Sequence, residues 1–107
     1  MKTQIQYKKK KIKYGFIGMN FFAHYHCRVK WPHVKHPEEI IEIYKNMPKD
    51  LRYATIQHEK CERYLMKNKH FNYLRAHKNA LRFEKLNKSF PAKNIKKRLE
   101  RMNFKIL

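Results

Sequence analysis

The sequence predicts a mainly α-helical fold with three or four short helices, a central antiparallel helical hairpin and a short N-terminal strand or β-hairpin. Apolar residues recur every three to four positions through most of the C-terminal two thirds, as on the buried face of a helix. An alternating pattern, typical of a strand, precedes them. The 107 residues fit one domain, and 42% hydrophobic residues suffice for a core. We expect a cationic N-terminal arm over residues 1–14 and a single α-rich domain over residues 15–107.

Two segments near the N-terminus carry strand-like patterns. Lysines alternate with apolar residues such as Ile5 and Tyr7 over residues 1–14. This pattern fits either a frayed cationic arm or a short edge strand whose lysines oppose aggregation, and we favour the arm. Over residues 21–31, histidine and basic side chains share one face and mostly apolar side chains the other. That alternation predicts a strand, which Pro32 ends.

Four later segments have the periodicity of amphipathic helices. The first, over residues 37–47, begins with a proline and two glutamates, and its apolar stripe is Ile40, Ile43, Tyr44 and Met47. Pro48 restarts the chain as a second helix that runs to about Met66, and a third helix covers about residues 71–86. The last helix has basic flanks. Its apolar stripe is formed by Ala92, Ile95, Leu99, Met102 and Ile106.

The chain is strongly basic. Lysine and arginine number 27 against eight acidic residues, which gives a net charge of +19. Residues 1–36 hold nine basic and no acidic residues, residues 37–69 hold seven against six, and residues 70–107 hold eleven against two. Such a charge repels itself unless an anionic partner neutralises it, and nucleic acid, RNA or DNA, is the partner we expect. An AT-rich genome or heat adaptation is an alternative cause of the lysine content.

The expected contacts to phosphate lie at the two cationic ends, where aromatic residues interleave with lysine. The candidate nucleic-acid-binding residues are Lys8, Lys9, Lys10, Lys11, Lys13, Arg28, Lys30, Lys93, Lys96, Lys97 and Arg101. For the last helix, an ordinary solvated basic face is the alternative interpretation. A structural role in a ribonucleoprotein or virion-like assembly is a third hypothesis.

Several classes of protein are not favoured by the sequence. No run approaches the roughly 18 to 20 apolar residues that a membrane span needs, and the first residues do not lead into the apolar run of a signal peptide. We therefore expect a cytoplasmic protein with no membrane partner. Cys27 and Cys61 are then expected to be reduced thiols rather than a disulfide.

The most specific signal is a set of ionisable residues on apolar helix faces. His58 and Glu62 lie one turn apart on the apolar face of the second helix, and His77 lies on that of the third. Burying such groups costs on the order of several kcal/mol unless they pair or bind a cation. If the two helices form a hairpin across residues 67–70, the three side chains converge and suit Zn²⁺ or another divalent ion. Glu84 is a further ligand or an outer acceptor that fixes an imidazole.

Three interpretations of this set remain open. Without a metal, His58, Glu62 and His77 form a buried network of hydrogen bonds and ion pairs, with Arg63 or Arg75 nearby. With a metal, the ion is either structural or catalytic.

A motif resemblance bears on the same residues. The stretch His58-Glu59-Lys60-Cys61-Glu62, followed by Tyr73, Ala76-His77, Ala80 and Glu84, resembles the HExxE … Y..AH..A…E pattern of small, mostly uncharacterised phage-like and archaeal proteins. The pattern is similar in part to zincin peptidases, which carry His at the position of Glu62. The resemblance implies that His58, Glu62 and His77 are metal ligands and that Glu59 is a general base acting on a metal-bound water. The implied function, an alternative to nucleic-acid association, is a metal-dependent hydrolase of phosphodiester or peptide bonds.

A second cluster of ligand-type side chains precedes the helices. It consists of His24, His26, Cys27, His33 and His36. Because His-x-His on a strand points both rings to one side, this cluster is either a metal site, a group of surface histidines beside phosphate, or part of the packing. His24 or His26 is also a candidate fourth ligand for the site around His58.

Overall fold

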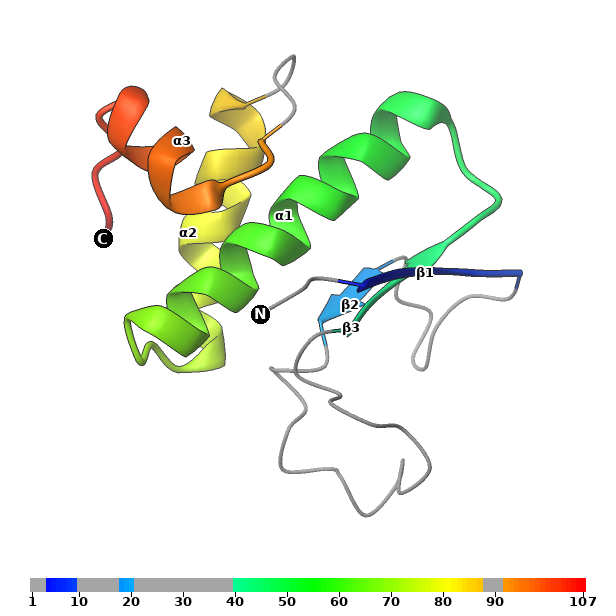
Figure 1. Ribbon diagram of the computed structural model, residues 1–107, viewed down its shortest axis with the longest axis horizontal. Helices are drawn as coiled ribbons and strands as arrows, with labels where there is room; N and C mark the ends of the chain where they lie inside the picture. Colours follow the sequence, from blue (N-terminus) through cyan, green and yellow to red (C-terminus); the bar gives the residue numbers. More distant parts are fainter. Residues whose placement is uncertain (1–3, 10–17, 21–39, 88–91) are drawn as a thin grey trace.

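The computed structural model describes residues 4–9, 18–20, 40–87 and 92–107. Within these residues, three strands precede three helices (Figure 1). The elements are β1 (Gln4–Lys8), β2 (Gly18–Asn20), β3 (Ile40–Tyr44), α1 (Lys49–Asn68), α2 (Tyr73–Leu86) and α3 (Ile95–Arg101). The described part of the chain is therefore mainly helical, which is the predicted class, with a small sheet at its N-terminal end.

The sheet is built around β3. Its strand order is β1-β3-β2, with β1 parallel and β2 antiparallel to the central strand. Ile40, Ile41 and Ile43 of β3 are buried. The predicted helix over residues 37–47 is thus wrong for residues 40–44, which form β3. Three isoleucines within four residues favour a pleated strand, because their branched side chains are restricted in a helix, and two neighbouring strands complete the hydrogen bonding of β3.

Part of the expected N-terminal arm is an edge strand. β1 pairs with β3 from Gln4 opposite Ile40 to Lys8 opposite Tyr44. Residues 4–8 therefore form the short edge strand that was the alternative to a frayed arm. Residues 10–14 of the arm lie outside the described residues. The strand predicted over residues 21–31 lies outside them as well.

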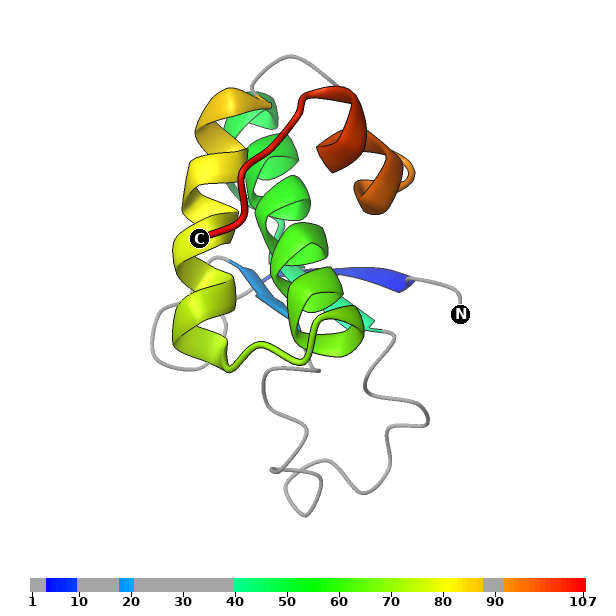
Figure 2. The ribbon, with the colours of Figure 1, turned by 90° about the vertical axis from the view of Figure 1, so that its left-hand side faces the viewer.

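The two long helices form the body of the molecule. α1 begins directly after Pro48, and α2 is capped by Asn72, whose side-chain oxygen accepts a hydrogen bond from the Arg75 backbone N–H at 2.9 Å. Four residues join them, and one of these, His70, has a φ of 57°. Figure 2 shows the helices side by side and running in opposite directions. The contacts of Glu62 with His77, and of His58 with Glu84, follow from this arrangement.

α3 is shorter than the apolar stripe from Ala92 to Ile106 predicts. It ends at Arg101, and Asn103 then adopts a φ of 50°. The following residues lie along α2, where the Leu107 backbone N–H donates to the side-chain oxygen of Asn79 at 2.8 Å. This hydrogen bond holds the C-terminal segment against α2, although the segment is not helical.

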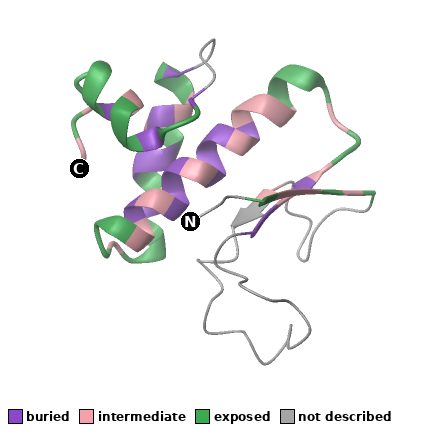
Figure 3. Cartoon of the chain, viewed as in Figure 1, coloured by how far each residue is buried: buried purple, intermediate pink, exposed green. Residues whose placement is uncertain are grey.

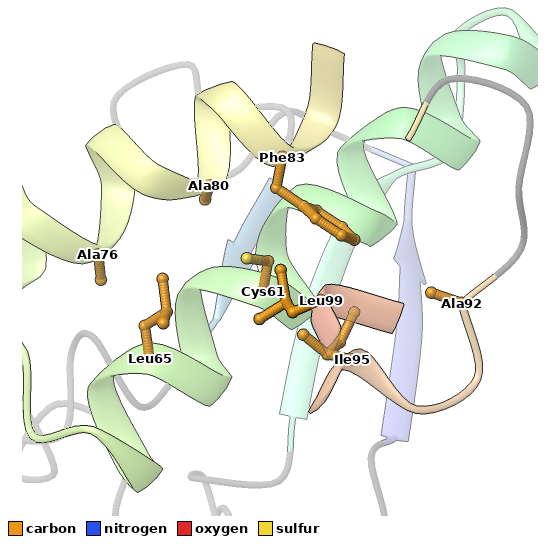
Figure 4. Close-up of a cluster of buried hydrophobic side chains, with 8 residues drawn as sticks. All are labelled: Cys61, Leu65, Ala76, Ala80, Phe83, Ala92, Ile95 and Leu99. Carbon is orange, nitrogen blue, oxygen red and sulfur yellow. The ribbon is translucent and has the colours of Figure 1, made fainter. Parts of the chain in front are cut away.

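α1 occupies the centre of the molecule. It contacts α2 and α3 and also packs on the sheet, and Figure 3 shows buried positions through the middle of the helix. The apolar core fills the space between the three helices (Figure 4). Its buried members are Cys61, Leu65, Ala76, Ala80, Phe83, Ala92, Ile95 and Leu99. Among the described residues, none of the helices combines the length and apolar character needed to cross a membrane.

Candidate metal centre

Three ligand-type side chains converge between α1 and α2. His58 and Glu62 lie one turn apart on α1, and His77 faces them from α2. The side chains of His58 and Glu62 are only 8% and 3% exposed, whereas that of His77 is 38% exposed. Two members of the group are thus shielded by the helix pair, and the third lies at its edge, where solvent has access.

The three contacting atoms form a nearly equilateral triangle. His58 Nε2 lies 3.1 Å from Glu62 Oε2, and His77 Nδ1 lies 3.0 Å from the same oxygen. The two ring nitrogens are 3.3 Å apart. The rings meet edge to face, with centroids 4.9 Å apart and an interplanar angle of 71°. Each residue therefore directs one nitrogen or oxygen atom toward a common point.

Hydrogen atoms cannot satisfy all three contacts of this triangle. A ring nitrogen of histidine is either a donor or an acceptor, and an ionised carboxylate only accepts. If both nitrogens carry hydrogen, both can donate to Glu62, but two N–H groups then face each other at 3.3 Å. If only one carries hydrogen, a lone pair of the other faces the carboxylate. At most two of the three contacts can therefore be hydrogen bonds. A central cation, in contrast, could accept a lone pair from each of the two nitrogens and from the carboxylate oxygen.

Glu84 contacts the opposite side of the His58 ring. Its Oε1 lies 3.3 Å from His58 Nδ1, which is within ion-pair distance but is not aligned as a hydrogen bond. The nitrogen that faces the triangle is Nε2. Glu84 is therefore not one of the three converging residues. Whether Glu84 is a further ligand or an outer acceptor that fixes the imidazole, the two roles expected from the sequence, stays a prediction.

The charges around His58 oppose the effect of its burial. Burial alone lowers the pKa of His58, but the hydrogen bond to Glu62 and the charges of Glu59, Glu62 and Glu84 outweigh it, so that the pKa of His58 is raised. Three carboxylates thus create a negative potential at this ring. The same potential would attract a cation.

Glu59 is buried but lies outside the converging group. A Cβ placed on Gly18 of β2 would be 3.3 Å from Glu59 Cγ, so the stem of the side chain lies against the sheet. Its carboxylate nevertheless acts on His58 through its charge. The role of general base for Glu59 stays a prediction.

The nearby thiol belongs to the apolar core. Cys61 is fully buried, and burial, together with the charge of Glu62, raises the pKa of its thiol to about 12. A thiolate ligand requires a deprotonated sulfur. Cys61 is a free cysteine that packs with Leu65 and Phe83, not a further member of the candidate centre.

Tyr73 adjoins the centre, although the sequence predicted no role for it there beyond the motif. It lies one turn before His77 on α2, and the two rings stack with centroids 5.4 Å apart and an interplanar angle of 23°. The signal in the sequence is this spacing of four residues, which places both side chains on one face of a helix.

The candidate nucleic-acid-binding residues divide into three groups. Lys93, Lys96, Lys97 and Arg101 are exposed on α3 and just before it. Lys8 on β1 is half-buried and acts electrostatically on Glu42 of β3, and Lys9 is exposed. Lys10, Lys11, Lys13, Arg28 and Lys30 lie outside the described residues, as does the whole second cluster from His24 to His36.

Comparisons with protein-family models, with curated proteins and with solved structures find no match to this chain.

Proposed function

We propose that this chain is a metal-binding protein in which His58, Glu62 and His77 hold one divalent ion, with zinc the best fit. The observation that supports the proposal most strongly is the triangle of two nitrogens and one oxygen, 3.0 to 3.3 Å on each side. Tetrahedral zinc, with ligands at about 2.0 to 2.2 Å, separates its ligands by roughly 3.3 to 3.6 Å. A small expansion of the triangle would admit the ion.

The composition of the group favours an open site. Three protein ligands of the His₂Glu type, with a fourth position left for water or substrate, are typical of catalytic zinc sites, whereas structural sites have four. The 38% exposure of the His77 side chain leaves an approach for a fourth ligand from solvent. Hydrolysis by a metal-bound water is therefore the reaction class that we attach to the proposed centre.

Zinc binding can be tested by calorimetry and thermal unfolding of the metal-free protein. His77→Ala is the informative variant, because His77 is the most exposed of the three residues and its removal should disturb the packing least. His70→Asn is a matched control: it removes an exposed histidine from the turn before α2, and asparagine tolerates its positive φ.

We expect zinc to stabilise the wild type and the His70→Asn variant by about 2.7 kcal/mol when its concentration is 100 times the dissociation constant. His77→Ala should show little of this gain. Equal stabilisation of all three proteins, or of none, would contradict the proposal.

A second proposed function is association with nucleic acid through the basic surface. It is supported by the net charge of +19 and by the exposure of Lys93, Lys96, Lys97 and Arg101 along one short helix and its start. Fluorescence anisotropy with labelled RNA and duplex DNA should reveal micromolar binding at moderate salt. The absence of binding to both would exclude this second function while leaving the metal centre untouched.

A further inference from the structure

α2 has a second apolar face, which is exposed. Its leucines, Leu74 and Leu81, are 77% and 45% exposed. They lie seven residues apart, so both project from nearly the same side of the helix. The buried face of α2, with Ala76, Ala80 and Phe83, packs in the apolar core with residues of α1 and α3 and does not include these leucines. The two leucines form an outer face of α2 that the core does not use.

A repeat of seven residues generates the outer face. The pattern Leu-Arg-x-x-Lys occurs at residues 74–78 and again at residues 81–85. A leucine at every seventh position is typical of a helix that packs along another helix. Lys78 and Lys85 follow the two leucines at the same spacing, and both are exposed. In paired helices, charges that flank the apolar residues determine which partner is chosen.

The two flanks of the outer face differ in charge. By helical spacing, Lys78 and Lys85 lie on the side away from α1. The side toward α1 carries Glu84, whose side chain is 34% exposed. The other carboxylates near the candidate metal centre, Glu59 and Glu62, are buried and do not add to this surface. Over the whole of α2, four basic residues stand against one acidic residue.

We propose that the outer face of α2 docks an acidic amphipathic helix of another protein. Apolar side chains of that helix would cover Leu74 and Leu81, and acidic side chains on one of its flanks would meet Lys78 and Lys85. A second copy of this chain fits the face less well, because each copy carries a net charge of +19. The docking does not require a metal ion.

The test uses two synthetic helical peptides of about 21 residues, or three heptads, as probes. Both have leucines along one face. One has glutamate at the flanking positions, and the other has lysine at the same positions. Fluorescence anisotropy of the labelled peptides measures their binding to the full chain. We expect the glutamate peptide to bind about 10-fold more tightly than the lysine peptide, or better, and the difference to shrink at high salt.

Substitution of the leucines tests the apolar part of the contact. Leu74→Gln and Leu81→Gln should each weaken binding of the glutamate peptide roughly 10-fold, as expected for a leucine that is buried on docking. Leu86→Gln is the matched control, because Leu86 is 60% exposed but lies on another side of α2. This variant should bind the peptide as the wild type does. Circular dichroism checks that each variant is folded.

Substitution of the lysines tests the charged part. Replacing Lys78 and Lys85 together by glutamine should reduce the preference for the glutamate peptide over the lysine peptide. The matched control replaces Lys96 and Lys97, two exposed residues of α3, and so removes the same charge elsewhere. The control should retain the preference.

Four results would overturn the proposal. The first is no binding of the glutamate peptide up to about 1 mM. The second is equal affinity for the two peptides, and the third is an equal loss of binding in Leu86→Gln and Leu74→Gln. The fourth is a dimer of the wild type in light scattering that Leu74→Gln dissociates, which would assign the outer face to a second copy of the chain.

Discussion

The two nitrogens of the His58 ring have different environments. Nε2 faces Glu62 and His77, whereas Nδ1 faces Glu84. In metal sites, the nitrogen that points away from the ion commonly meets a carboxylate, which fixes the tautomer and the orientation of the ring. For the proposed centre, we therefore expect Glu84 to act through His58 rather than as a ligand of the ion.

This division predicts different effects for two conservative substitutions. Glu84→Gln should weaken zinc binding roughly 10-fold, because changes outside the ligands commonly cost 10- to 100-fold, and Glu62→Gln should cost more than about 100-fold. Competition with a chromophoric chelator measures both, with Glu100→Gln, at an exposed position of α3, as the control. Equal losses for the two variants would mean that Glu84 is itself a ligand.

The sequence predicts the convergence of His58, Glu62 and His77 because it requires only the helical period and a short turn. The contact of Glu84 with Nδ1 and the stacking of Tyr73 on His77 depend on how each ring is turned. Periodicity places a side chain on a face of a helix but does not give its rotamer. The contact of Glu84 and the stacking of Tyr73 could therefore not be predicted from the sequence.

Among the elements, the helices were predicted better than the strands. α1 and α2 are long enough for a stripe to repeat several times, which identifies the period. Ile40–Tyr44, by contrast, has only four apolar residues around Glu42, a pattern too short to distinguish the two periods, and its identity as β3 depends on pairing with distant β1 and β2. Local pattern alone cannot show that those partners exist.

The contact between β2 and α1 leaves no room for a side chain at Gly18. A Cβ there would lie 2.5 Å from Thr55 Cγ2, so Gly18→Ala should destabilise the protein by about 1 to 3 kcal/mol in chemical denaturation. Thr55→Ser removes that methyl group and keeps the hydroxyl that donates to the Leu51 carbonyl. The double variant should recover much of the loss. Additive losses would contradict this packing.

Glu42 on β3 gives the sheet a pH dependence. Burial raises its pKa, and the charge of Lys8 lowers it by less. The pKa of Glu42 is therefore higher in the folded protein than in the unfolded one. Glu42 contributes most to the free energy of unfolding below the unfolded pKa, where it is protonated, and this contribution is lost as pH rises through the folded pKa.

Glu42→Gln should therefore be more stable than the wild type at pH 7, by up to about 0.5 kcal/mol for a half-buried group, and this advantage should shrink toward pH 4. Urea denaturation at both pH values measures it. A gain that is larger at pH 4 than at pH 7 would contradict the assignment.

At the scale of the whole molecule, the charge is concentrated away from the middle of the chain. Residues 37–69, which contribute α1 and β3, are nearly neutral, whereas residues 70–107 hold eleven basic and two acidic residues. On α3, Ile95 and Leu99 form the buried side, and the basic side chains are on the opposite, exposed side. The proposed association with a polyanion is therefore expected at this segment.

The proposed nucleic-acid function predicts a specific salt dependence. Replacing Lys93, Lys96 and Lys97 by glutamine should reduce the slope of log affinity against log salt by about two to three, since each phosphate contact contributes roughly 0.9 for duplex DNA. The matched control replaces exposed Lys45, Lys49 and Lys69 from the near-neutral segment. Anisotropy titrations at several salt concentrations compare them. An equal change in both triple variants would show that only total charge matters.

In the proposed centre, a divalent ion joins α1 to α2. The metal content can be measured by elemental analysis of protein purified without chelators, loaded with zinc and then dialysed, with Glu62→Gln analysed in parallel. We expect about one equivalent of metal in the wild type and a small fraction of that in the variant. A wild-type content below a few tenths of an equivalent would contradict it, and His58, Glu62 and His77 would then be a buried polar network without a metal.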